Sequence, residues 1–357
     1  MVDAGGLNPP DSRGSCGFES RPGYAFDVLI SCTTRQYRAF LGEFKVGSHL
    51  DLVEMLEHEM RPWPVPHWGV SIINYAGNQL GDGLVIGESE YSFALASVSK
   101  PISALAALVA YEEGLFLLDD LVDPLQVSWR ELLSHASGLA YDSHGAVAES
   151  DLESLFGSDG PARERYFSRS PRRRRIYSNL GFECMAYALA REAGIPFARY
   201  VQEAIFDPLG MRSSSMGGDV FATAGPSGAA AGVVSTVADM SKFMQELVSP
   251  RLVSDATLGE ASRCQLGELA GLLPGYGGQV NNAWGLGFEI RDSKAPHWSG
   301  ALNSTATFGH FGQSGTFIWN DPVAQIALCF LGNRPFDEFA KSAWPSLSDL
   351  VISHFEA

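Results

Sequence analysis

Strand-like segments lie in two separate parts of this chain, with a long helical stretch between them. Trp68–Tyr75 and Leu80–Ile86 are rich in apolar and β-branched residues and flank a turn at 76–78, which predicts an antiparallel hairpin. Strand patterns return only at 284–290, 307–311, 315–319 and 325–331. From about 134 to 278 the patterns are helical or loop-like. We therefore expect an α+β fold whose antiparallel sheet is completed by the C-terminal part of the chain.

This arrangement predicts three regions. Residues 51–114 and 283–357 together form an α/β sheet domain, flanked by helices, and residues 115–282 form an inserted helical domain. Helices are expected near 52–60, 102–111, 180–193, 197–205, 237–248 and 336–355. A cleft between the sheet domain and the inserted domain is the natural ligand site.

Residues 1–50 differ from the rest of the chain. Pro, Gly and Ser dominate 5–23 without periodicity, which favours a poorly structured leader. Gly17–Pro22 also resembles the translation of one arm of a transfer-RNA gene, so we hypothesise a start-site artefact, with the true start further along. N-terminal sequencing of the native protein would exclude this hypothesis by finding Met1.

Composition excludes several classes of protein. With 357 residues and 45% hydrophobic content the chain can bury a large core, and its net charge of -16 argues against a nucleic-acid partner. No apolar run is long enough to span a membrane, and no secretory signal pattern is present. Five scattered cysteines without a C-x-x-C pair favour free thiols in a reducing compartment, so we expect a cytoplasmic protein. The oligomeric state is not predicted.

Ser97 and Lys100 stand three residues apart at the start of a helical pattern that ends at Gly114. Residues i and i+3 share a helix face, so the Lys100 amine can reach the Ser97 hydroxyl. If burial keeps the amine unprotonated, it can accept the hydroxyl proton and make a nucleophile. The alternative is an N-capping serine beside a solvated lysine.

Tyr177 and Asn179 precede the helical pattern 180–193. A phenol near an ammonium can relay a proton, and an amide can hold a substrate carbonyl. The alternative is a capped helix start with a half-buried tyrosine. Just before them, 172–175 is a run of four arginines, interpreted as a solvated loop rather than as an anionic-substrate clamp.

His310 and Gly312 fall on a predicted strand, with Gln313 next. A strand glycine lets another backbone or a ligand approach closely. The N–H groups of Ser97 and Gln313 can then stabilise an oxyanion, each such donor being worth about 3 kcal/mol in the barrier. The alternative is a bulge glycine beside a surface histidine. His135 and Trp284 are predicted to pack near the cleft.

The chain resembles the serine β-lactamase and penicillin-binding-protein superfamily in three motifs and in their order. These are Ser97-x-x-Lys100, Tyr177-x-Asn179 and His310-x-Gly312. The likeness is to its class C-like branch of esterases, D-aminopeptidases and D,D-carboxypeptidases. The stretches 132–139, 206–211 and 309–316 are also similar to that branch. The resemblance covers about 52–355 and implies a β-lactamase/transpeptidase-like fold, with a mixed three-layer α/β domain beside a helical one.

The resemblance also implies roles for these residues. Ser97 is the acylated nucleophile, Lys100 accepts or shuttles its proton, and Tyr177 protonates the leaving group and activates water. Asn179 positions the substrate carbonyl, and His310, Gly312 and Gln313 belong to the substrate-binding strand. No G-x-S-x-G, H-E-x-x-H or P-loop motif is present, which disfavours an α/β-hydrolase, a zincin and a P-loop NTPase. We expect no metal and no cofactor.

One departure bears on the substrate. Where β-lactamases have a lysine cation that helps to hold a carboxylate, this chain has His310, which is mostly neutral at pH 7. We therefore expect a serine hydrolase acting on small-molecule esters or small amides, most plausibly a carboxylesterase. The alternatives are a β-lactamase or D,D-carboxypeptidase, an acyltransferase, and a penicillin-binding sensor that acylates once without turnover.

Overall fold

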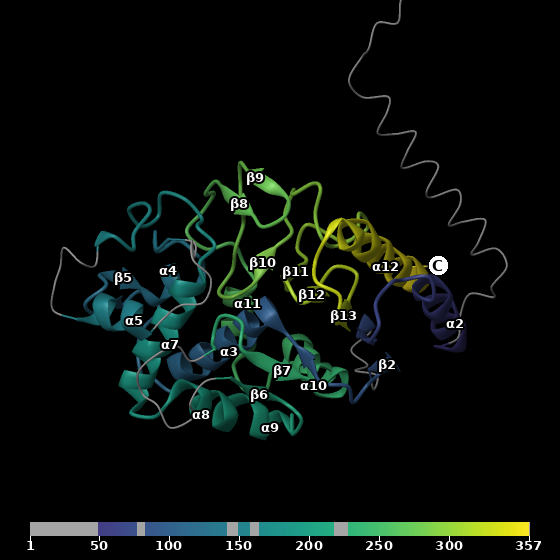
Figure 1. The fold of residues 1–357 in the computed structure, drawn as a ribbon, viewed down its shortest axis with the longest axis horizontal. Coiled ribbons are helices and arrows are strands. Elements are labelled where there is room, and N and C mark those ends of the chain that lie inside the picture. The colour runs from purple at the N-terminus through teal and green to yellow at the C-terminus, as the bar shows by residue number, and fades with distance from the viewer. Residues whose placement is uncertain (1–48, 77–82, 141–148, 158–163, 218–227, 357) are drawn as a thin grey trace, which may run out of the picture. The chain divides into compact units, whose positions relative to one another are not determined.

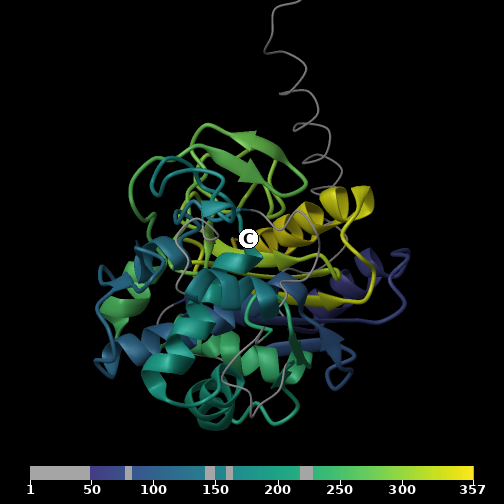
Figure 2. The same ribbon diagram turned by 60° about the vertical axis from the view of Figure 1, so that its left-hand side comes forward.

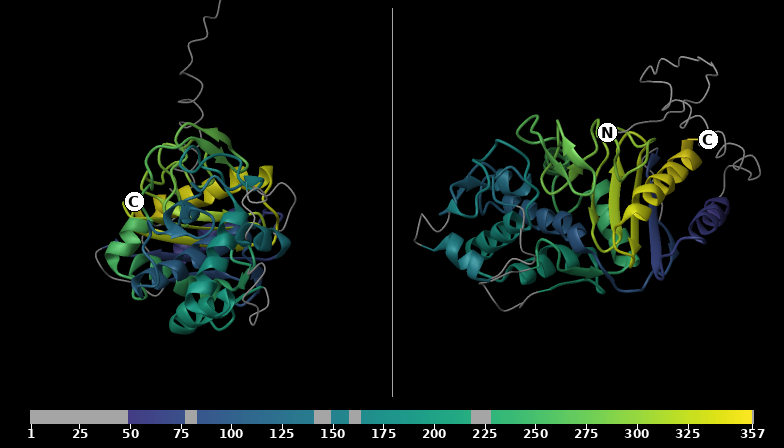
Figure 3. Two further views of the ribbon diagram at one scale, coloured as in Figure 1. Left: turned by 90° about the vertical axis from the view of Figure 1, so that its left-hand side faces the viewer. Right: turned by 45° about the horizontal axis from the view of Figure 1, so that its top comes forward.

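The computed structural model describes residues 49–76, 83–140, 149–157, 164–217 and 228–356. Its main feature is a six-stranded antiparallel sheet. The strand order is β10 (Glu289–Ile290), β11 (Phe308–Gly312), β12 (Thr316–Asp321), β13 (Ile326–Gly332), β1 (Trp68–Asn74) and β2 (Leu84–Gly87). The early strand β1 pairs with the late strand β13, so that Val70 faces Phe330. The prediction that the C-terminal part of the chain completes the sheet is confirmed, and Figure 3 shows these purple and yellow strands side by side.

Helices cover both faces of this sheet (Figure 2). The Trp319 indole donates to Ser348 Oγ of α12 (Glu338–Glu356) at 3.0 Å. The next residue, Asn320, donates instead to the carbonyl of Leu247 in α10 (Val237–Val248), also at 3.0 Å. Successive strand residues point to opposite faces, so α12 and α10 lie on opposite sides of β12. The result is three layers, helix on sheet on helix.

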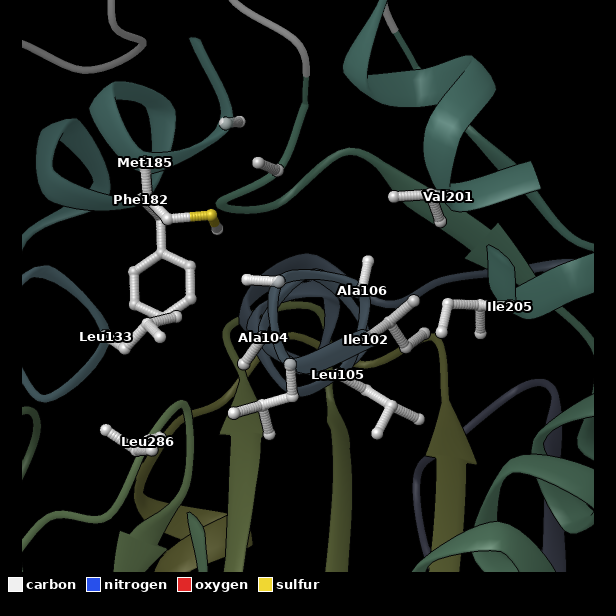
Figure 4. Packing of buried hydrophobic residues seen from close by; sticks show 14 of the residues in the cluster. Ile102, Ala104, Leu105, Ala106, Leu133, Phe182, Met185, Val201, Ile205 and Leu286 are labelled. Carbon is white, nitrogen blue, oxygen red and sulfur yellow. The ribbon is translucent and has the colours of Figure 1, made fainter. Parts of the chain in front are cut away.

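Helix α3 (Ser99–Glu112) runs through the middle of the hydrophobic core. Its residues from 99 to 108 are all buried, and most of them are apolar. Figure 4 shows Ile102, Leu105 and their neighbours surrounded by side chains from α7 (Asn179–Ala193), α8 (Phe197–Val201) and the π-helical turn η3 (Gln202–Phe206). The predicted helices 180–193 and 237–248 are confirmed.

The remaining elements are short. They are α2 (His49–Met60), β3 (Phe93–Ala94), the 3-10 turn η2 (Ala96–Val98), β4 (Leu121–Val122), β5 (Val127–Ser128), α4 (Trp129–Leu133), α5 (Glu149–Phe156), α9 (Asp207–Leu209), β6 (Ser215–Met216), β7 (Val233–Ser235), α11 (Asp255–Ala261), β8 (Gly271–Leu273) and β9 (Gly277–Gln279) (Figure 1). The expectation of no strand between 134 and 278 was therefore wrong. Strands of two or three residues are too short to show an alternating pattern, and pairing with distant segments defines them.

The predicted strand at 284–290 is also shorter than expected. Only its last two residues, β10, pair in the sheet. Gly287 has a positive φ of 86°, and a Cβ there would lie 2.1 Å from the Cβ of Ala104 in α3. The segment before β10 is thus a loop pressed against α3, where no side chain fits at 287.

Residues 52–357 form one compact unit, and residues 1–51 form another, of which only 49–51 are described. The predicted leader and the start-site hypothesis therefore lie outside the described residues. The division of the larger unit at 115 and 283 stays a prediction; α10, from the predicted insertion, packs on β1 and β13. Within the described ranges, no helix is both long and apolar enough to cross a membrane.

Candidate active site

Ser97 lies where the chain passes from β3 into α3. The single turn η2 holds it, and the preceding Ala96 has a positive φ of 46°. A left-handed conformation costs a non-glycine residue about 1–3 kcal/mol, so the surrounding structure must stabilise it. Val98 stands at the N-cap of α3 and no side chain bonds there, so the alternative of Ser97 as an N-capping residue is not seen. The Ser97 side chain is half-buried.

Lys100 lies one turn further along α3 and is fully buried. Its Nζ is 3.2 Å from Ser97 Oγ, 2.6 Å from Asn179 Oδ1 and 2.8 Å from the carbonyl oxygen of Ala230. The predicted contact between Ser97 and Lys100 is present, and the lysine is not solvated. A buried amine next to a hydroxyl is the arrangement in which a neutral lysine can accept the hydroxyl proton.

The segment that supplies Ala230 is held by three hydrogen bonds from two helices, α7 and α3. The Glu183 carboxylate of α7 accepts from the Ala230 N–H at 3.0 Å. From α3, Ser103 donates to the Ala229 carbonyl at 2.8 Å, and Ser99 accepts from the Val233 N–H at 2.9 Å. These bonds fix the Ala230 carbonyl against Lys100.

Asn179 and Tyr177 reach the site because of the way α7 begins. Ser178 is the N-cap and accepts from the Gly181 N–H at 3.0 Å, which makes Asn179 the first helical residue and points its amide towards Lys100. Tyr177, just before the cap, is half-buried, and Lys100 Nζ lies 4.7 Å from its ring centroid. Both predicted residues of the second motif therefore meet the first motif.

Three rings surround Tyr177. The centroid of His135 is 4.7 Å from that of Tyr177, and the centroids of Trp284 and His310 are each 5.8 Å away. His135 and Trp284 do pack at the site, as predicted. His310 is 3% exposed, so the alternative of a surface histidine is wrong.

Both histidines of this cluster are neutral at pH 7. Burial is the main cause that lowers the pKa of His310, to about 3, and a positive charge on Lys100 acts in the same direction. The same two causes hold the pKa of His135 well below its usual value. The third motif therefore provides no cation at neutral pH.

Gly312 brings β11 against the segment that carries Ser97. A Cβ at this position would lie 2.3 Å from the carbonyl oxygen of Leu95 and 3.3 Å from the Cβ of Ala96. Thr316 of β12 donates to the same Leu95 carbonyl at 2.9 Å. The close approach predicted for this glycine is present because no side chain fits between the two backbones.

Gln313 follows at the end of β11. Its carbonyl accepts from the Phe336 N–H at 2.9 Å, and its side-chain amide donates to the Phe336 carbonyl at 3.1 Å. These bonds anchor the turn after Gly312 beside Ser97. The use of the Ser97 and Gln313 N–H groups as an oxyanion hole stays a prediction.

A cavity of about 770 Å³ adjoins the Tyr177 side of this group. It is lined by Arg174, Arg175, Ile176, Tyr177, Leu272, Leu273, Pro274, Gly275, Gly277 and Gln313. The β8–β9 hairpin forms its outer wall. Sequence reasoning missed this hairpin and the Ala230 carbonyl; the Gly/Ser-rich connections were the only available signal that loops pack around a site.

The run of four arginines is only partly the solvated loop that was expected. Arg172, Arg173 and Arg174 are exposed, but Arg175 is 2% exposed. Its guanidinium donates to the Ser134 carbonyl at 2.9 Å and to the carbonyl of Gln265. A side chain with five donors can join several loop carbonyls at once, which a count of charges along the sequence does not reveal.

Comparison with known proteins agrees with this geometry. A solved β-lactamase from Mycobacterium bovis is 42% identical and superposes with a TM-score of 0.73, covering 86% of this chain and 100% of its own. Penicillin-binding protein 4* of Bacillus subtilis is 32% identical over 34% of this chain. The chain spans 30% of that relative's length and about half of the length of several further curated relatives.

The fold is shared more widely than the sequence. EstCE1, described as a hydrolase with promiscuous acyltransferase activity, is 19% identical with a TM-score of 0.63, over 84% of this chain and 96% of its own. These neighbours show the predicted β-lactamase/transpeptidase-like fold. The Beta-lactamase family model matches residues 90–351, a range that contains all three motifs described above. The chain therefore belongs to the beta-lactamase family of serine hydrolases.

Proposed function

We propose that this protein hydrolyses carboxylic esters or small amides through an acyl-enzyme on Ser97. The observation that carries the proposal is the contact of Lys100 Nζ with both Ser97 Oγ, at 3.2 Å, and Asn179 Oδ1, at 2.6 Å. A buried amine in contact with a partly exposed serine hydroxyl can activate that hydroxyl as a nucleophile.

In the first step Ser97 Oγ attacks the substrate carbonyl and its proton passes to neutral Lys100. The N–H groups of Ser97 and Gln313 stabilise the negative oxygen of the tetrahedral intermediate. Collapse breaks the bond to the leaving group, which takes a proton from the Tyr177 phenol. Lys100, 4.7 Å from the Tyr177 ring centroid, returns a proton to that phenol. Asn179 holds the substrate carbonyl group.

In the second step a water molecule attacks the acyl-enzyme. The Tyr177 and Lys100 pair accepts the water proton, the same N–H groups stabilise the intermediate, and the carboxylic acid leaves as Ser97 recovers its proton. Atoms balance as one ester or amide plus one water giving one acid and one alcohol or amine.

Neutral His310 supports esters or small amides over β-lactams. A cation on β11 would provide a charge-assisted bond to a carboxylate next to the reacting carbonyl, worth about 1.5–3 kcal/mol. The low pKa of His310 removes that bond at neutral pH. We further propose a cytoplasmic location, from the cysteine pattern.

A β-lactamase or D,D-peptidase activity is the second candidate. It is favoured by the family itself and by the 42% identity to the Mycobacterium bovis β-lactamase. The esterase and the β-lactamase or D,D-peptidase differ in whether the site binds a substrate carboxylate beside β11.

The test uses a p-nitrophenyl ester and nitrocefin with the wild type, Ser97→Ala and the control Ser92→Ala, an exposed serine upstream. Turnover of the ester alone supports the esterase, and turnover of both supports the β-lactamase. One burst without turnover supports a sensor. Intact mass after a fluorophosphonate should show an adduct on Ser97 in the wild type and Ser92→Ala; an unmodified Ser97 would refute the proposal.

A further inference from the structure

The cavity beside Tyr177 has an apolar wall and a cationic rim. Ile176, Leu272, Leu273 and Pro274 supply apolar surface, and Leu272 is 62% exposed. Arg174 and Arg175 lie on the side that leads into Tyr177. Of the described residues that line it, none is acidic. The cavity lining is therefore positively charged, although the whole chain has a net charge of -16.

Arg174 differs from two nearby arginines whose guanidinium groups are paired with carboxylates. Arg172 is paired with Glu131, and Arg130 is paired with both Asp119 and Glu260. Within the described ranges of the chain, no carboxylate or carbonyl bonds the exposed guanidinium of Arg174. Its fork of donors is therefore available to a ligand in the cavity.

Arg175 adds a second cation behind the wall. Its guanidinium is buried against backbone carbonyls, and its Nε has no hydrogen-bond partner among the described residues. Cys264 Sγ lies 3.8 Å from Nη2. A buried guanidinium held by neutral carbonyls leaves its charge uncompensated locally, so an anion at Arg174 is attracted by both side chains.

We infer that the substrate carries a carboxylate on its leaving group, separated from the reacting bond by an apolar segment, and that Arg174 binds this carboxylate at the cavity rim. The leaving group is assigned because Tyr177, its proton donor in the proposed function, lines the same cavity. The inference rests on that proposed function. It is compatible with neutral His310, because the anion lies at the far wall rather than on β11.

The test compares two acetyl esters, 3-(4-acetoxyphenyl)propanoate and its primary amide. They share the reacting bond, and two methylene groups insulate the phenol from the charged or neutral end. We expect the wild type to prefer the carboxylate about tenfold to a hundredfold in kcat/KM, the effect of one charge-assisted bond. Added salt should reduce this preference.

Arg174→Gln should remove most of that preference by raising KM for the carboxylate, and it should lower kcat/KM for the amide much less. Arg173→Gln is the matched control, since Arg173 is the adjacent exposed arginine and does not line the cavity; it should leave both esters unchanged. The product 3-(4-hydroxyphenyl)propanoate should protect Ser97 from a fluorophosphonate in the wild type and less in Arg174→Gln.

Equal kcat/KM for the two esters, or a preference that survives Arg174→Gln, would overturn the inference while leaving the proposed function intact. Hydrolysis of neither ester by a protein that still forms the Ser97 adduct would overturn it as well. Loss of the adduct itself identifies failure of the proposed function instead.

Discussion

Two lysines of this chain are buried to the same degree and have different partners. Lys294 is 2% exposed and lies 2.9 Å from the Glu289 carboxylate, with further bonds to the carbonyls of Ala283 and Ile290. Lys100 is fully buried, and its Nζ lies within hydrogen-bond distance of a serine hydroxyl, an asparagine amide oxygen and a carbonyl. The partners of Lys294 stabilise its positive charge, whereas the partners of Lys100 include the Ser97 hydroxyl, which can act as a nucleophile.

The surroundings of Glu289 complete the contrast. His297 Nε2 lies 3.1 Å from Oε1, and the Trp298 indole donates to Oε2 at 2.7 Å. The Lys294 cation, together with these hydrogen-bond partners, overcomes the effect of burial and holds the pKa of Glu289 far below its usual value. Burial alone therefore does not mark a functional lysine; the chemical type of its partners does.

The largest expected effect separates the two lysines by activity. Lys100→Met should lower kcat by about a thousandfold or more, since it removes the proton acceptor of Ser97. Its effect on the free energy of unfolding should stay below about 2 kcal/mol, because the lost hydrogen bonds are offset by the removal of a polar amine whose burial costs free energy. Ester hydrolysis and urea unfolding measure both quantities. Unchanged kcat would remove Lys100 from the mechanism.

Lys294→Met should give the opposite result. It leaves the buried Glu289 carboxylate without its lysine, which costs about 3–5 kcal/mol of stability. The activity of each folded molecule should be retained. The double variant Glu289→Gln/Lys294→Met should recover part of the lost stability, and additivity of the two single changes would contradict a direct pairing.

Gly312→Ala tests the close packing of β11 against the segment that carries Ser97, next to Lys100. The new Cβ would lie 2.3 Å from the Leu95 carbonyl, so the strand must move away from Ser97. We expect a loss of about 1–3 kcal/mol in stability, as for overpacking, with a fall in kcat. Gly278→Ala, where a Cβ meets nothing within 4 Å, is the control. Equal behaviour of the two variants would argue against close packing at 312.

The smallest effect concerns pH. His310 is neutral in the folded protein, with a pKa of about 3, whereas in the unfolded chain it titrates near 6.5. Between these values the unfolded chain binds a proton that the folded protein does not, so His310 makes stability fall as pH decreases from about 6.5 towards 3.

His310→Gln should therefore reduce the loss of stability between pH 7.5 and pH 5 by about 1–2 kcal/mol. Urea unfolding at both pH values gives the difference. His58→Gln, on the exposed part of α2, controls for the loss of an imidazole that stays in contact with water. A pH dependence identical to that of the wild type would show that His310 takes up its proton in the folded protein.

Local patterns made part of the site predictable. Ser97 and Lys100 meet because residues three apart share a helix face, and the helices 180–193 and 237–248 follow from their apolar spacing. Asn179 could be placed through the start of α7, since the Ser178 cap is a local signal. The sheet could be predicted because β1, β11, β12 and β13 are runs of five or more residues rich in apolar and aromatic side chains, as expected of strands buried on both faces.

By itself the sequence determined which residues to propose for the chemistry and which helices carry them, because motif spacing and helix periodicity depend on near neighbours. Only the tertiary structure decided what surrounds them: the burial of His310 and Arg175, the Ala230 carbonyl on Lys100, and the cavity wall formed by β8 and β9. These features arise from contacts between segments far apart in the chain, such as Arg175 with Ser134, 41 residues away, and Lys100 with Ala230, 130 residues away. No local pattern records such contacts, since burial and pKa depend on the whole set of groups that pack around a side chain.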